Sequence, residues 1–88
     1  MEFRSNDEYF AALCALTERW CDERNLEALS RVLPGYLSFN GLTDGWVGLY
    51  ESLKLTRFLG YEAFSPADWA LLQELVRGAE RAIGRVRT

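Results

Sequence analysis

The stretch that decides the fold is SPADWALLQELVRGAERAI, residues 65–83. Ser65 is a suitable N-cap, Pro66 suits the first helical position, and Asp68 places an acid in the first turn, where the helix dipole favours one. Apolar residues then recur at helical spacing on one broad face: Trp69, Leu72, Leu75, Val76, Ala79, Ala82 and Ile83. Polar and charged residues occupy the other face. The sequence therefore predicts an amphipathic helix over residues 66–84.

A second strong helix signal lies near the N-terminus. Ser5 and Glu8 have the spacing of a capping box, in which each side chain accepts a hydrogen bond from the other residue's amide. Two apolar stripes follow, roughly 100° apart around the helix. The first stripe contains Tyr9, Leu13, Leu16 and Trp20. The second contains Phe10, Cys14, Thr17 and Cys21. We expect a core helix over residues 5–22.

Two further helices are expected between these. Leucines and a valine indicate a short helix over residues 25–33, separate from the first because its apolar stripe would be displaced by well over about 100°. Pro34-Gly35 is typical of a helix end, so residues 34–43 are expected to form an aromatic-rich loop. A third helix over 44–59 is apolar around most of its circumference, which is typical of a helix buried on two sides.

Length and composition agree with this assignment. Residues 1–88 are enough for one helical domain, and we expect an all-α, compact bundle of about four helices. The chain is 49% hydrophobic with a net charge of −3, which argues against disorder. It has neither an apolar run of about 18 residues nor the pattern of a secretory signal. We expect a cytoplasmic protein without membrane contact, and the excess of arginine over lysine favours a bacterial source.

The residue content argues against catalysis. The chain has no histidine, which removes the commonest general base, the catalytic Ser-His and Cys-His pairs, and the zinc sites that use histidine. No glycine loop ends in Gly-Lys-Ser/Thr, so a P-loop is excluded. Cys14 and Cys21 would lie about 10 Å apart on one helix, too far for a disulfide. We expect both to act as small buried hydrophobic residues, with a redox-sensing or intermolecular role as the alternative. We therefore expect no enzyme and no cofactor.

Two sets of charged residues leave alternatives open. Carboxylates occur at the end of the first helix and on the third: Glu18, Asp22, Glu23 and Glu51. They could bind a divalent cation but match no EF-hand loop, and a solvated face is the simpler interpretation, so we expect no metal. Arginines recur toward the C-terminus: Arg77, Arg81, Arg85 and Arg87. Acidic residues interrupt them in an acidic chain, so we expect no nucleic-acid partner.

The amount of apolar surface favours an interaction surface. Such surface must be covered by the chain's own fold or by a partner, and a symmetric dimer is the simplest cover. We predict a protein–protein interaction module that self-associates as a homodimer through the third helix and the aromatic loop. The residues expected to form this surface are Tyr36, Phe39, Trp46, Tyr50, Leu55, Arg57 and Leu59.

Other interpretations stay open from the sequence alone. A monomer could use all its apolar side chains internally. The aromatic residues could instead line a pocket for a small-molecule ligand, with Arg57 or Tyr50 as its polar group. A regulatory or inhibitor-type protein would share the features of an interaction module and cannot be separated from it.

Overall fold

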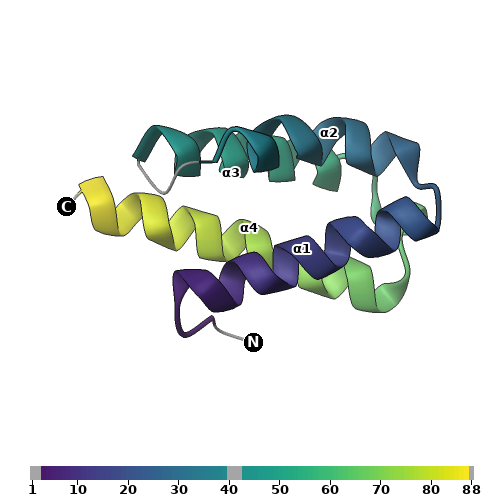
Figure 1. The fold of residues 1–88 in the computed structure, drawn as a ribbon, viewed down its shortest axis with the longest axis horizontal. Helices are drawn as coiled ribbons and strands as arrows, with labels where there is room; N and C mark the ends of the chain where they lie inside the picture. The colour runs from purple at the N-terminus through teal and green to yellow at the C-terminus, as the bar shows by residue number, and fades with distance from the viewer. Residues whose placement is uncertain (1–2, 40–42, 88) are drawn as a thin grey trace.

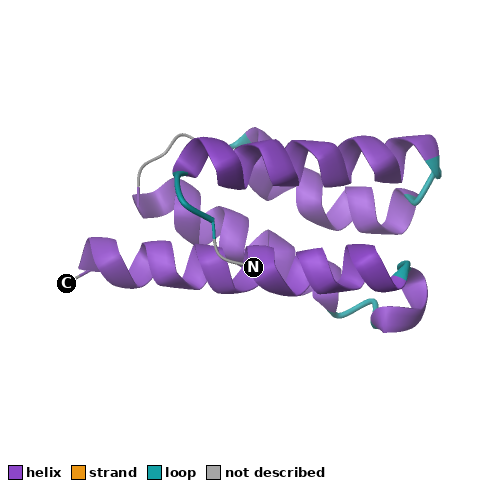
Figure 2. Cartoon of the chain, turned by 90° about the horizontal axis from the view of Figure 1, so that it is seen from below, coloured by secondary structure: helices purple, strands orange, loops and turns teal. Residues whose placement is uncertain are grey.

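Four antiparallel α-helices make up the described part of the chain, residues 3–39 and 43–87 of the computed structural model (Figure 1). They are α1 (Asn6–Asp22), α2 (Leu26–Leu37), α3 (Thr43–Arg57) and α4 (Pro66–Arg87), with a short 3-10 helix, η1 (Tyr61–Ala63), before α4. The helices α1 and α4 lie side by side in one layer, and α2 and α3 form the other (Figures 1 and 2). The predicted all-α bundle is confirmed.

The ends of α1 and α4 follow the capping residues of the sequence. Ser5 Oγ accepts a hydrogen bond from the Glu8 amide at 3.1 Å, and Ser65 Oγ accepts one from the Asp68 amide at 3.2 Å. Each bond satisfies an amide that has no partner within its helix. The first and last helices therefore begin where the sequence predicts.

A sharp turn separates α1 from α2, as predicted. Arg24 has a φ of 58°, in the left-handed region, which stops α1. Asn25 then caps α2, since its Oδ1 accepts from the Ala28 amide at 3.3 Å. Its Nδ2 donates to the Ala63 carbonyl at 3.2 Å, which fastens this turn to η1.

The prediction that Pro34-Gly35 ends the second helix is wrong, because α2 continues to Leu37. Pro34 is exposed, and the Ser38 hydroxyl donates to its carbonyl at 2.7 Å. Gly35 is buried against α3, where an added Cβ would lie 2.5 Å from Ser52 Oγ. The glycine thus serves helix packing rather than helix termination. The expected loop over 34–43 begins only at Ser38, and its residues 40–42 lie outside the described part of the chain.

The core draws on all four helices, and its aromatic residues form two groups at opposite ends. One group lies where α1 begins: Phe3, Tyr9, Phe10, Phe39 and Trp46. The other lies where α1 ends: Trp20, Phe64 and Trp69, with the exposed Tyr61 at its edge. Leucines fill the layers between them. Because each aromatic ring removes about 150–250 Å² from water, these groups stabilise both ends of a small bundle.

Tyr9 joins α1 to α4 within the first aromatic group. Its hydroxyl donates to the Leu75 carbonyl, and burial raises the pKa of this hydroxyl well above its usual range. Gly78 allows the contact, because an added Cβ would lie only 2.6 Å from the Tyr9 ring. The polar end of a core side chain is therefore satisfied inside the bundle.

Candidate interaction surface

The residues predicted for the interaction surface do not form a single surface. Trp46 is buried in the core, so it adds nothing to an exposed surface. Phe39 packs against Trp46 at 4.7 Å and Phe10 at 4.4 Å between ring centroids. Tyr36 lies half-buried in α2, and a hydrogen bond with the Cys14 side chain raises its pKa. The fold itself uses the aromatic part of the predicted surface.

The other predicted residues lie on α3 or just after it. Arg57 is half-buried and its Nη1 donates to Gln73 Oε1 at 3.5 Å. Tyr50 is also half-buried, with Lys54 Nζ 4.6 Å from its ring centroid, a cation–π contact. Leu59 is half-buried, whereas Leu55 is 53% exposed. Of the seven predicted residues, Leu55 gives the largest apolar exposure.

The structure shows a more exposed residue beside Leu55. Phe58 is 81% exposed, and its amide still donates to the Lys54 carbonyl at 3.1 Å, so it continues the helical turn of α3. At 100° per residue, one arc of about 100° contains Val47, Glu51, Lys54, Leu55 and Phe58. We call this arc the outer face of α3.

The outer face corrects the expectation that α3 is buried on two sides. The buried residues Leu49, Leu53 and Thr56 lie on the opposite side of the helix and face the core. Because α3 occupies one corner of a four-helix square, its neighbours α2 and α4 cover only the inward half (Figures 1 and 2). The second apolar side that the sequence indicated is real, but Leu55 stays half exposed and Phe58 largely exposed, with Arg31 of α2 donating to the Leu55 carbonyl at 2.8 Å.

The charges on the outer face are balanced. The exposed Glu51 places its Oε1 3.9 Å from Nζ of the half-buried Lys54, one helical turn away. Gly48 borders the face, and a Cβ added there would have no heavy atom within 4 Å. The outer face thus combines two exposed apolar side chains, one acid, one base and an adjacent vacant position.

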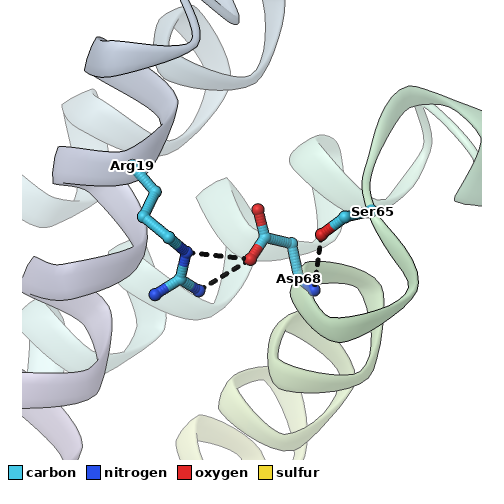
Figure 3. Close-up of polar contacts among 3 residues, drawn as sticks. All are labelled: Arg19, Ser65 and Asp68. Carbon is cyan, nitrogen blue, oxygen red and sulfur yellow. Dashed lines mark hydrogen bonds and ion pairs between the residues drawn. The ribbon is translucent and has the colours of Figure 1, made fainter.

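A partly buried ion pair links α1 to α4 (Figure 3). Arg19 on α1 donates from Nε and Nη2 to Asp68 Oδ1 on α4, at 3.1 and 2.6 Å. The Asp68 side chain is only 4% exposed, whereas that of Arg19 is 45% exposed. The sequence predicted Asp68 only as a first-turn acid, because its partner lies 49 residues away.

The remaining candidate chemistry is sparse. Cys21 is exposed and Cys14 only half-buried, so the prediction of two buried thiols is wrong. The Cys14 thiol lies 3.7 Å from Glu18 Oε1. Within residues 3–39 and 43–87, no three cysteine or carboxylate side chains gather as a metal site, and no helix is long and apolar enough to cross a membrane. Arg77 pairs with Glu74 at 2.7 Å, and the side chains of Arg85 and Arg87 lie outside the described part.

Comparison with known proteins gives no relative: no protein-family model, curated protein or solved structure matches the chain. Function is therefore inferred from the residues and their geometry.

Proposed function

We propose that this chain is a non-catalytic protein–protein interaction module that pairs with a second copy of itself through the outer face of α3. The exposure of Phe58 beside Leu55 carries the proposal. Burying a phenylalanine or leucine side chain yields about 1.5–3 kcal/mol, and the described monomer leaves most of this gain unused at both residues. A two-fold dimer covers the same patch on both copies at once.

The alternative of a small-ligand pocket has weaker support. Of the two expected polar groups, Arg57 is bonded to Gln73, and Lys54 lies over the ring of Tyr50. A groove of about 410 Å³ does run along α4, lined by Arg19, Ala67, Ala70, Leu71 and Glu74. Its charged side chains are paired within the chain, Arg19 with Asp68 and Glu74 with Arg77. We place the dimer in the bacterial cytoplasm on the sequence features given above.

Solution mass measured over a concentration series tests the proposal. Light scattering or sedimentation from about 1 µM to 1 mM should show a shift from monomer to dimer, since an interface formed by one helix face of each copy is small and small interfaces bind weakly. Phe58→Ser should stay monomeric over the same range. Leu37→Ser is the matched control, because Leu37 is 76% exposed but lies at the end of α2. A wild-type protein that is monomeric throughout, or a Phe58→Ser protein that dimerises equally well, contradicts the proposal.

A further inference from the structure

We propose a specific geometry for the pair, which rests on the proposed function. Two α3 helices meet antiparallel, and the two-fold axis lies level with the point halfway between Ser52 and Leu53 along each helix. Glu51 of each copy then lies opposite the partner's Lys54. We infer that the partner is a second copy of this chain, because the outer face is complementary to itself in charge and in shape.

The spacing along α3 sets this register. With 1.5 Å of rise per residue, Glu51 and Lys54 each lie about 2 Å from the axis, on opposite sides. Val47 and Phe58 each lie about 8 Å from it, again on opposite sides. Two-fold symmetry therefore brings each glutamate to a lysine near the centre and each Phe58 to the partner's Val47 at the two ends.

Neighbouring registers are disfavoured by like charges. Sliding one helix by three residues, about 4.5 Å, places Glu51 opposite the partner's Glu51 in one direction. In the other direction Lys54 meets the partner's Lys54. Like charges brought together oppose association, so the single acid and single base select one alignment.

Gly48 supplies the shape complementarity. A glycine inside a helix is less stabilising than alanine, yet an alanine Cβ at residue 48 would clash with nothing in the monomer. In the antiparallel pair this vacant position lies next to the partner's Phe58 ring. A large side chain of one copy thus faces a gap on the other.

Charge reversal at two positions tests the register. Glu51→Lys leaves lysine at both central positions, and Lys54→Glu leaves glutamate at both. We expect each variant alone to dimerise at least about tenfold more weakly than the wild type, since two attractive contacts become repulsive. An equimolar mixture should recover a heterodimer of about wild-type affinity. Glu80→Lys, the same charge change at an exposed position in the middle of α4, should leave the affinity unchanged.

Sedimentation of the separate and mixed variants, with circular dichroism to verify the helices, distinguishes the outcomes. A wild-type dimer whose charge variants do not recover on mixing overturns the register and leaves the proposed function standing. A wild-type monomer overturns both. Gly48→Ala gives an independent readout: we expect a higher melting temperature of the monomer together with weaker dimerisation. Unchanged or tighter dimerisation of this variant contradicts the placement of the Phe58 ring beside residue 48.

Discussion

The ion pair between Arg19 and Asp68 gives a prediction that depends on which partner is removed. Arg19→Met keeps the apolar stem but leaves the Asp68 carboxylate buried without a charged partner. Asp68→Asn keeps an acceptor for the guanidinium, and the half-exposed Arg19 can be hydrated instead. We therefore expect Arg19→Met to be the more damaging change.

The magnitudes follow from burial. Breaking a fully buried pair costs about 3–5 kcal/mol, and a hydrogen bond to a charged group is worth about 1.5–3 kcal/mol. Because Arg19 is 45% exposed, we expect the lower range, about 2–3 kcal/mol for Arg19→Met. For Asp68→Asn we expect about 1 kcal/mol, which includes the lost charge in the first turn of α4. At about 4–8 °C per kcal/mol, Arg19→Met should melt roughly 10–20 °C lower.

Urea unfolding at neutral pH measures both free energies, and the double variant Arg19→Met/Asp68→Asn completes the cycle. We expect the double variant to lose less than the two single changes together, because the uncompensated carboxylate is absent from it. Equal losses from the two single changes, or a larger loss from Asp68→Asn, would refute the view that a buried carboxylate depends on Arg19.

Substitutions at Gly35 and Tyr9 probe the packing and the titration of the core. Gly35→Ala should lower the free energy of unfolding by about 1–3 kcal/mol because its Cβ would meet Ser52. Gly84→Ala is the control and should be neutral or stabilising, because the space around the new Cβ is open. If chemical unfolding shows equal effects for the two variants, the close approach of α2 and α3 is contradicted. Above pH 10, the usual tyrosine pKa, unfolded Tyr9 loses its proton while folded Tyr9 keeps it, so stability should fall by up to about 1.4 kcal/mol per pH unit. Tyr9→Phe should flatten this alkaline slope in unfolding titrations, and an unchanged slope would mean that Tyr9 is not its source.

The elements that the sequence predicted well depend on local chemistry. Ser5 and Ser65 cap helices through bonds to amides three residues away, so a short window contains the whole signal. The end of α2 could not be predicted in this way. Pro34-Gly35 has the local chemistry of a helix end, but contact between Gly35 and Ser52 on α3 favours continued helix, and that contact is visible only in the fold.

The candidate surface was predictable only in part. The two-sided apolar pattern of α3 indicated an excess apolar face, and Leu55 lies on it. Phe58 is absent from the predicted surface, because the direction from which α2 and α4 pack decides which side of α3 stays open. Trp46 carries the same apolar signal as Phe58 in the sequence, yet it lies in the core. Periodicity gives the angle between two residues but not the direction of the nearest neighbouring helix.

The two aromatic groups also equip the protein with separate fluorescent reporters. Trp46 lies in the group where α1 begins, while Trp20 and Trp69 lie in the group where α1 ends. Trp46→Phe restricts tryptophan emission to the group where α1 ends. Replacing Trp20 and Trp69 restricts it to the group where α1 begins. Unfolding curves from these variants, referred to helix loss measured on the same samples, would reveal whether one end of the bundle opens before the other or both lose structure in a single step.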